Sequence, residues 1–262
     1  MPKPQIGVVV PTLNSASTLH WTLCALHSQR GVTLNVIVAD SGSTDATLEL
    51  CKHWSVRTIY VPPGNMYRAI NAGLREIDSE WVTYLNSDDV VYPSSYARLL
   101  ARGEEKKACL VYGDCDFVDY EGRFLFMQKS PPAPRLAGLA RLSPVFKGRL
   151  GFTQPTAIYR RIAFEELNGF DEVYRFFSDV DFFYRFITSG RPAAKLPRPT
   201  VAAFRLHNKQ LSVRQASSIQ EEMRRFRKAT TIRPMPADWL DVLSWRLLNS
   251  PVYLWRLSRL RP

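Results

Sequence analysis

The residues best placed to do chemistry are Asn86, Ser87, Asp88 and Asp89, which directly follow the apolar stretch 81–85. Two adjacent carboxylates repel each other unless a cation or a proton offsets their charge. Divalent cations such as Mg²⁺ prefer oxygen ligands and accept one or two protein carboxylates together with phosphates. The cluster is therefore a candidate metal site. The alternative is an Asp-rich turn that caps the following helix.

The elements that must position this cluster alternate between strand and helix. Apolar runs predict buried strands, and helical spacing or capping residues between them predict helices; the strands are 6–10, 34–39, 57–61 and 81–85, and the helices lie around 19–26, 45–51 and 65–75. This order is typical of a parallel α/β sheet with right-handed crossovers, in which ligands bind beyond the carboxyl ends of the strands. The polar clusters 12–15, 40–45 and 86–89 therefore share one rim, which favours the metal site over the capping turn.

The second half of the sequence is less regular. We expect a short strand at 110–112, a hairpin over 117–128 that turns at Glu121-Gly122, and helices at 179–188 and 216–229. The segment 130–149 combines prolines with basic residues and predicts a mobile loop.

Length and charge limit the class of protein. The chain has 262 residues, of which 45% are hydrophobic, so it can bury a full core and is not disordered as a whole. The net charge of +11 is concentrated at the C-terminal end, because residues 185–262 hold 16 Lys and Arg against 4 Asp and Glu. Four cysteines without a CxxC pair, the absence of a signal-peptide pattern and the absence of a long apolar run favour a cytoplasmic protein with reduced thiols.

Five motifs, in order and spacing, resemble those of the family-2 glycosyltransferases of the GT-A fold. The matching segments are 8–14 (VVVPTLN), 38–45 (VADSGSTD), 64–73 (GNMYRAINAG), 85–89 (LNSDD) and 168–181, which contains NGFDE and SDVD. The resemblance covers about residues 5–213. It implies a Rossmann-like α/β fold with a mostly parallel central sheet in a domain 1–213, divided into a nucleotide-sugar half, 1–112, and an acceptor half, 113–213. A basic helical extension, 214–262, completes the predicted organisation.

The resemblance also implies an activity, namely inverting transfer of a hexose from a nucleoside-diphosphate sugar, with UDP favoured, to a glycan hydroxyl. A divalent metal, Mn²⁺ or Mg²⁺, would offset the negative charge that grows on the leaving diphosphate. The implied metal ligands are Asp88, Asp89 and His207, the last within an Arg-x-His pattern. Asn86 stands where the family often has an acidic residue. The implied donor-binding residues are Pro11, Thr12, Asn14, Asp40, Arg68, Asn71, Asn86, Ser87 and Asp88.

Asp179 is the candidate general base for the acceptor hydroxyl, although Ser178 replaces the Glu that the family usually shows before it. Asp181 is the alternative base, or a first-turn Asp that interacts with the helix dipole. Asp114 and Asp116 are candidates for the sugar or acceptor side, and a strand-end turn is the alternative for these two. Gln154 and Thr156 lie where the family has an acceptor-site loop, so the resemblance implies that they are acceptor-side residues as well.

The C-terminal segment 238–260 mixes tryptophan, leucine and arginine, a composition typical of helices that lie on an anionic membrane surface. We therefore expect peripheral membrane attachment, which suits a lipid-linked acceptor in polysaccharide or cell-envelope biosynthesis. The alternative is that the tryptophans pack on the catalytic domain or on a second copy of the chain in a homodimer. A sugar-nucleotide-binding module without turnover is the alternative function. Nucleic acid is not an expected partner, because the segment lacks glycine-rich or base-stacking motifs.

Overall fold

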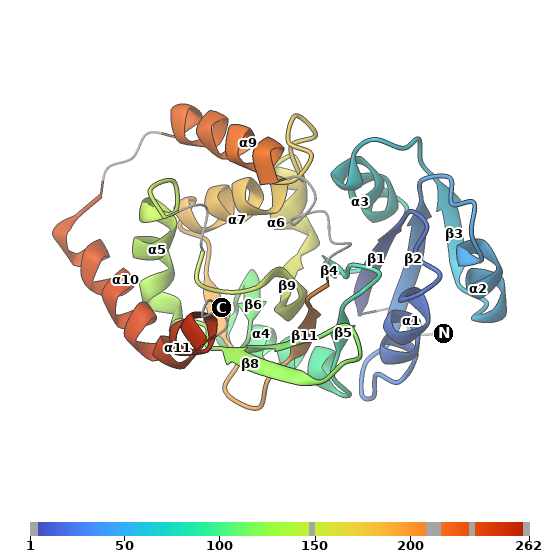
Figure 1. Cartoon of the computed structure of the whole chain (residues 1–262), viewed down its shortest axis with the longest axis horizontal. Coiled ribbons are helices and arrows are strands. Elements are labelled where there is room, and N and C mark those ends of the chain that lie inside the picture. The colour runs from blue at the N-terminus through green and yellow to red at the C-terminus, as the bar shows by residue number, and fades with distance from the viewer. Residues whose placement is uncertain (1–4, 147–149, 208–215, 231–233, 259–262) are drawn as a thin grey trace.

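The computed structural model describes residues 5–146, 150–207, 216–230 and 234–258 (Figure 1). A seven-stranded sheet with strand order β10-β6-β9-β4-β1-β2-β3 lies at its centre. The strands are β1 (Ile6–Thr12), β2 (Leu34–Asp40), β3 (Arg57–Tyr60), β4 (Trp81–Tyr84), β6 (Leu110–Tyr112), β9 (Ala157–Arg160) and β10 (Ala193–Lys195). Only β9 runs antiparallel to its neighbours, so the prediction of a mostly parallel sheet is confirmed.

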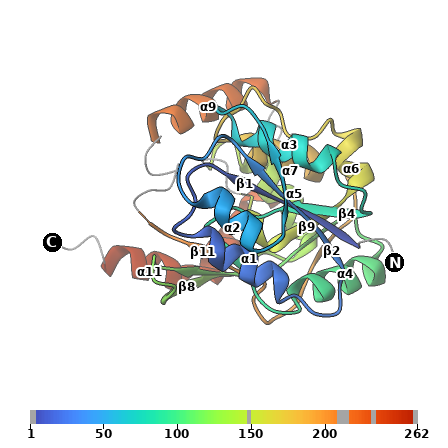
Figure 2. The ribbon, with the colours of Figure 1, turned by 90° about the vertical axis from the view of Figure 1, so that its right-hand side faces the viewer.

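Helices cover both faces of this sheet (Figure 2). Along β1 the side chains alternate: Val8 and Val10 pack in the cluster that contains α1, α2 and α4, and Val9 packs in the cluster that contains α3, α5, α6 and α7. The helices are α1 (Leu19–His27), α2 (Thr47–His53), α3 (Met66–Arg75), α4 (Ser95–Lys106), α5 (Leu136–Leu142), α6 (Arg161–Glu166) and α7 (Ser178–Thr188). Gly73 lets α3 lie directly on β1, because a Cβ there would come within 2.7 Å of Val9 Cγ2.

A second, four-stranded sheet lies beside the first, with strand order β5-β11-β7-β8. It comprises β5 (Val90–Val91), β7 (Cys115–Val118), β8 (Phe124–Gln128) and β11 (Ala202–Arg205). β7 and β8 form the predicted hairpin, with Gly122 at a φ of 86° in the turn. β5 directly follows the Asn86–Asp89 cluster, so this cluster stands at the junction of the two sheets.

The prediction of a mobile loop over 130–149 is wrong for its central part. Residues 133–135 form the short 3₁₀ helix η1 (Ala133–Arg135) and continue into α5. Leu136, Leu139 and Leu142 recur at helical spacing and are buried, so apolar burial fixes a segment whose prolines and arginines suggested a loop. A second 3₁₀ turn, η2 (Gln154–Thr156), precedes β9.

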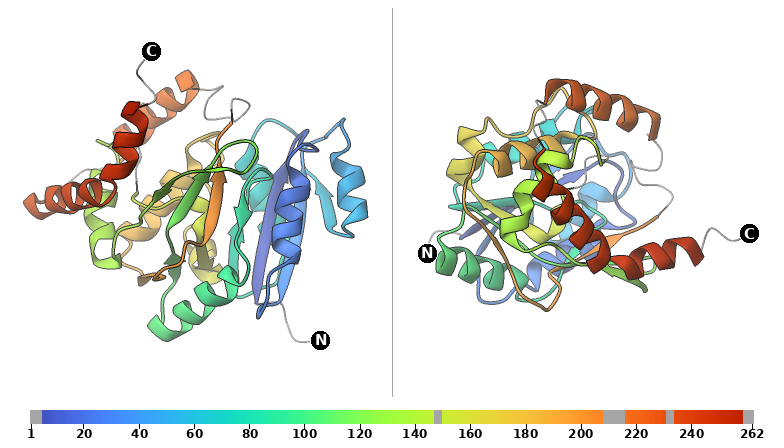
Figure 3. Two further views of the ribbon diagram at one scale, coloured as in Figure 1. Left: turned by 60° about the horizontal axis from the view of Figure 1, so that its bottom comes forward. Right: turned by 90° about the vertical axis from the view of Figure 1, so that its left-hand side faces the viewer.

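The basic extension consists of α9 (Ala216–Ala229), α10 (Pro236–Leu248) and α11 (Ser250–Ser258). α9 packs on α7 through Phe226, and α10 crosses α5 (Figure 3), where Arg141 forms an ion pair with the buried Asp238. The predicted boundary at 213 lies outside the described residues. The predicted boundary at 112 falls at the end of β6, but β9 and β10 complete the central sheet from beyond it. No helix in the described ranges is both long enough and apolar enough to cross a bilayer.

Candidate functional site

A cleft of about 770 Å³ opens beyond the carboxyl ends of β1 and β4. Most of its wall comes from residues 11–15 at the end of β1, residues 64–67 at the start of α3, residues 86–88 after β4, residues 152–155 before β9, residues 175–179 at the start of α7, and His207 after β11. This is the rim at which the strand order predicts a ligand. The predicted residues that line it are Pro11, Thr12, Asn14, Asn86, Ser87, Asp88, Gln154, Asp179 and His207.

Asp88 and His207 meet in this cleft, although 119 positions separate them in the sequence. The His207 Nε2 atom lies 2.9 Å from Asp88 Oδ2, and both side chains are partly buried. A carboxylate is a preferred ligand for Mn²⁺ and Mg²⁺, and a neutral imidazole is a common ligand for transition-metal ions. Within the described ranges no group of three His, Cys, Asp or Glu side chains could hold a metal ion, so these two would bind a metal only together with ligand or water oxygens.

Two residues of the cleft wall, Asn86 and Gln154, each carry an unsatisfied hydrogen-bond acceptor. The amide nitrogen of Asn86 donates to Asp89 Oδ2 at 3.2 Å, and the amide nitrogen of Gln154 donates to the Tyr84 carbonyl at 2.6 Å. These bonds leave Asn86 Oδ1 and Gln154 Oε1 buried without a hydrogen-bond partner in the described structure. A buried acceptor without a donor is costly, so a bound molecule or ion at this position would relieve that cost.

Asp89, one of the predicted metal ligands, is not among the described residues that line the cleft. Its side chain is fully buried and accepts a hydrogen bond of 3.0 Å from the backbone N–H of Arg205. Burial, and then the neighbouring charge of Asp88, raise the pKa of Asp89 well above its usual value. The Arg205 side chain in turn donates from Nε to the Asp88 carbonyl at 3.0 Å. Asp89 therefore joins β11 to the turn after β4 and leaves Asp88 as the carboxylate that reaches the cleft.

Asp40 is also buried and makes only local contacts. Its carboxylate accepts hydrogen bonds from Thr12 Oγ1 at 3.0 Å, from Ser43 Oγ at 2.5 Å and from two backbone N–H groups of the following turn. Asn14, at a φ of 52°, accepts from the backbone N–H of Thr44 at 2.8 Å. Asp40 thus holds Thr12 and the turn at the cleft wall but is not among the described residues that line it.

Two predicted residues of α3 hold the fold instead of lining the cleft. Asn71 is buried and bonds to both the carbonyl and the N–H of Phe170, and Arg68 pairs with Glu172 on the surface at 3.3 Å. The cation that the structure places at the cleft is Arg175, which the sequence analysis missed. Its Nε donates to the Gly64 carbonyl at 2.8 Å. A lone arginine between two motifs carries no periodic signal that would have identified it.

Asp179 stands at the start of α7 and faces the cleft. Tyr67 donates a hydrogen bond of 2.9 Å to its Oδ1, and the backbone N–H of Val180 donates to the same oxygen. Among the described residues no hydrogen-bond donor contacts its Oδ2. Burial raises the pKa of Asp179, and the bond from Tyr67 opposes that shift. A desolvated carboxylate with one uncommitted oxygen has the properties of a proton acceptor.

Asp181, the alternative base, forms an ion pair with Arg185 at 2.7 Å one turn further along α7. Arg185 also donates to the carbonyls of Leu167 and Gly169. Asp181 is not among the described residues that line the cleft. Of the two candidate bases, Asp179 is therefore the one that faces the cleft.

Three of the four predicted acceptor-side residues are engaged elsewhere. Asp114 bonds to the Ser130 backbone and to Lys195, Asp116 accepts from Tyr92 and Thr200, and the Thr156 hydroxyl donates to the Thr153 carbonyl. Of these bonds, that of Thr156 lies within the turn η2, whereas Asp114 and Asp116 bind residues at least 16 positions away in the sequence. Gln154 does line the cleft, and the structure adds unpredicted neighbours at the same edge: Tyr120, Phe152, Thr153 and Phe176.

Known proteins resemble this chain in sequence. Residues 7–168 match the description Glycosyl transferase family 2. The succinoglycan biosynthesis protein ExoO of Rhizobium meliloti is 30% identical over 67% of this chain and 53% of its own length. The glycosyltransferase GlyA of Streptococcus pneumoniae is 30% identical over 47% of this chain and 18% of its own length. The chain thus spans about half, or less, of the curated relatives described here.

Solved structures share the fold. TarS of S. aureus in complex with UDP has a TM-score of 0.65 and 18% identity, over 85% of this chain and 64% of that one. The mannosyltransferase PcManGT of Pyrobaculum calidifontis, in complex with GDP-Man and Mn²⁺, has the same TM-score and identity over 94% of this chain and 70% of that one. The sheet order, the cleft at its rim and the family match agree: this chain is a member of glycosyltransferase family 2 with the GT-A fold.

Proposed function

We propose that this chain is an inverting, metal-dependent hexosyltransferase that uses a nucleoside-diphosphate sugar, with UDP as the first candidate. The acceptor would be a hydroxyl of a cell-envelope glycan or a lipid-linked oligosaccharide. One observation carries the proposal: a single cleft presents both the Asp88–His207 pair and the carboxylate of Asp179. The similar structures were solved with UDP-GlcNAc, or with GDP-Man and Mn²⁺, and ExoO is a succinoglycan biosynthesis protein, which supports this class of substrates.

The donor diphosphate would lie beside Asp88 and His207. A divalent metal bound there would offset the negative charge of the departing diphosphate. Asp88 and His207 would supply one oxygen and one nitrogen ligand, and Asn86 Oδ1 lies unsatisfied at the same wall. Residues 11–14, held by the Asp40 turn, would contact the nucleoside side of the donor.

Asp179 would accept the proton of the acceptor hydroxyl while that oxygen attacks the anomeric carbon. The new bond forms between the acceptor oxygen and the anomeric carbon, and the bond from that carbon to the diphosphate oxygen breaks. Attack from the face opposite the leaving group inverts the configuration at this carbon, in a transition state that resembles an oxocarbenium ion. The alternative, a sugar-nucleotide-binding module, needs no base, and nothing in it requires the uncommitted oxygen of Asp179.

The extension supports a membrane partner. Trp245 is buried, and the ring centroids of Trp255 and Phe126 lie 4.7 Å apart. These two tryptophans therefore pack on the body of the protein, which is the alternative to membrane contact. On the opposite face of α10, however, Leu240, Leu243 and Leu247 are more than half exposed. Arg246 lies between the last two, and residues 185–262 carry a net charge of +12. An exposed apolar face within a segment of net positive charge matches an anionic lipid surface, where each basic residue contributes about 1 kcal/mol.

The variant Asp88→Asn should lose the metal-dependent part of donor binding. Calorimetry with UDP, GDP, CDP and dTDP, each with and without Mn²⁺, should show that Mn²⁺ strengthens binding of one nucleotide at least tenfold in the parent protein. That gain should vanish in Asp88→Asn, because the charged ligand is gone. The exposed carboxylate Asp171 gives the control, Asp171→Asn, which should keep the gain. Metal-independent binding in the parent protein would contradict the proposed metal site.

The variant Asp179→Asn should reduce turnover by at least 10³-fold, since it removes the proton acceptor. Its affinity for the nucleotide should stay within twofold, because the base does not touch the donor diphosphate. Product analysis with a panel of glycan acceptors measures the turnover. Asp181→Asn is the matched control and should retain more than a tenth of the parent rate. Full turnover in Asp179→Asn would assign the base to another group.

The variant Tyr67→Phe should shift the acid limb of the pH–rate profile to higher pH. The hydrogen bond from Tyr67 favours the charged carboxylate of Asp179, so its removal raises the pKa of that group further. The rate falls as the pH drops through this pKa, since the protonated carboxyl cannot accept a proton. An acid limb that stays in place in Tyr67→Phe, at unchanged thermal stability, would show that Asp179 does not control it.

The triple variant Leu240→Gln/Leu243→Gln/Leu247→Gln should bind vesicles of 30% phosphatidylglycerol in phosphatidylcholine at least tenfold more weakly than the parent protein. Each exposed leucine contributes on the order of 1 kcal/mol to burial in the lipid interface. Cosedimentation measures the effect, and Ile162→Gln, an equally exposed apolar residue on α6, should bind as the parent does. If light scattering shows instead that the triple variant dissociates a dimer while vesicle binding persists, the exposed face is a contact between copies.

A further inference from the structure

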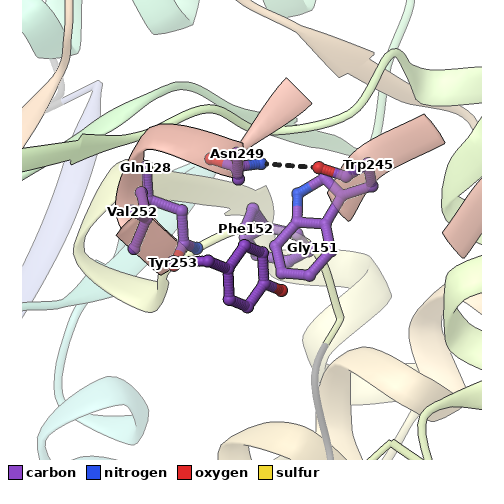
Figure 4. A pocket seen from close by; sticks show the side chains of 7 residues that line it. All are labelled: Gln128, Gly151, Phe152, Trp245, Asn249, Val252 and Tyr253. Carbon is purple, nitrogen blue, oxygen red and sulfur yellow. Dashed lines mark hydrogen bonds between the residues drawn. The ribbon is translucent and has the colours of Figure 1, made fainter. Parts of the chain in front are cut away.

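A second, smaller pocket of about 110 Å³ lies where α10 and α11 meet the body of the protein (Figure 4). The rings of Phe152, Trp245 and Tyr253 gather around it. Val252 and Gly151 complete its apolar part, and the polar lining groups are Gln128 and Asn249. None of the lining side chains is charged, so the pocket has no electrostatic preference for a phosphate or a cation.

The walls of this pocket are fixed by hydrogen bonds that the fold itself uses. Asn249 accepts from the backbone N–H of Lys129 at 2.8 Å and donates to its carbonyl at 2.9 Å, and Trp245 Nε1 donates to the same carbonyl at 3.0 Å. Gly151, at a φ of 93°, closes another side; a Cβ there would come within 2.9 Å of Leu139 and Pro131. The pocket is therefore preorganised rather than formed by mobile side chains.

Phe152 connects this pocket to the transfer cleft, because it lines both. Its ring stacks on Tyr112 at 4.9 Å and meets Phe183 edge-on at 5.0 Å, and Phe183 lies one turn after the base Asp179 on α7. Gln128 reaches in the same direction, since its amide nitrogen donates to Thr153 Oγ1 at 3.1 Å and Thr153 lines the cleft. A chain of sugars that leaves the cleft beside Asp179 would meet the small pocket next.

The chemistry of the lining matches a neutral sugar ring. Aromatic rings pack against the C–H face of a pyranose, and an amide oxygen accepts from its hydroxyls. The amide oxygen of Gln128 has no hydrogen-bond donor among the described residues. At about 110 Å³ the pocket is well below the roughly 300 Å³ at which sites for whole small molecules begin, so it has room for one ring rather than for a nucleotide.

We infer that this pocket is a binding subsite for a neutral pyranose of the acceptor, next to the sugar whose hydroxyl is glycosylated. The inference rests on the proposed transfer function for the identity of the ligand, while the binding itself can be tested without turnover. In this arrangement the C-terminal helices select the acceptor, because two of the aromatic residues that line the pocket, Trp245 and Tyr253, belong to α10 and α11.

The test uses the full chain with uniformly ¹⁵N-labelled protein and the indole N–H signal of Trp245, assigned with Trp245→Phe. The probes are the methyl pyranosides of glucose, galactose, mannose and N-acetylglucosamine, and cyclohexanol as an apolar ring without the sugar hydroxyl pattern. At least one pyranoside should shift the Trp245 signal in a saturable way. Its apparent Kd should weaken at least fivefold in Tyr253→Ala and in Gln128→Leu. Tyr60→Ala, which removes an exposed tyrosine from β3, is the control and should bind as the parent does.

Two results would overturn the inference. In the first, no pyranoside shifts the Trp245 signal, or cyclohexanol alone does. In the second, the pyranoside shift is unchanged in both Tyr253→Ala and Gln128→Leu, which would place the sugar elsewhere. Metal-dependent nucleotide binding by the same sample, measured in parallel, distinguishes failure of the subsite from failure of the proposed function. If this nucleotide binding is present, the proposed function stands without the subsite. If it is absent, the proposed function itself fails.

Discussion

The arrangement of the site depends on one buried hydrogen bond, from the backbone N–H of Arg205 to the carboxylate of Asp89. Asp89 closes the turn after β4 in the central sheet, and Arg205 ends β11 in the second sheet. A fully buried carboxylate must have donors, since an unpaired one would be expensive to desolvate. The hydrogen bond that meets this requirement joins the two sheets. Because His207 is two residues beyond Arg205, the same junction places His207 next to Asp88. The geometry of the cleft at Asp88 and His207 thus follows from the hydrogen bond that satisfies Asp89 at this junction.

A comparable constraint positions Asp179, the proposed base. Asn71 of α3 bonds to the backbone of Phe170, and Tyr67, one turn earlier on the same helix, donates to Asp179. Because Gly73 allows α3 to lie directly on β1, the base is held at a fixed position relative to the strand that supplies residues 11–15 of the cleft. The wall proposed to bind the donor and the proposed proton acceptor therefore share one rigid support, as an aligned attack at an anomeric carbon would require.

The strands and helices of the first half could be predicted because the spacing of apolar residues along the sequence agrees there with their burial in the fold. In Ile6–Val10, for example, every residue is apolar or Gly and is buried. The rim of the sheet could be predicted for the same reason. Which rim carboxylates face the ligand could not, because Asp40, Asp88 and Asp89 all follow strands and differ only in the donors that the tertiary fold brings to them. α5 was missed because its leucines stand among prolines and arginines, and Arg175 was missed because no local pattern marks it.

The two faces of α10 have different surroundings, which bears on why the extension exists. Residues 238, 242, 245 and 249 recur at helical spacing and are buried against the body, and the last two, Trp245 and Asn249, line the small pocket. Leu240, Leu243 and Leu247 occupy the opposite face, and nothing in the described structure covers them. One helix therefore stands between a pocket suited to a sugar ring and a surface suited to lipid. A lipid-linked oligosaccharide has both chemical parts in one molecule, so this single helix would recognise its glycan and its membrane anchorage together.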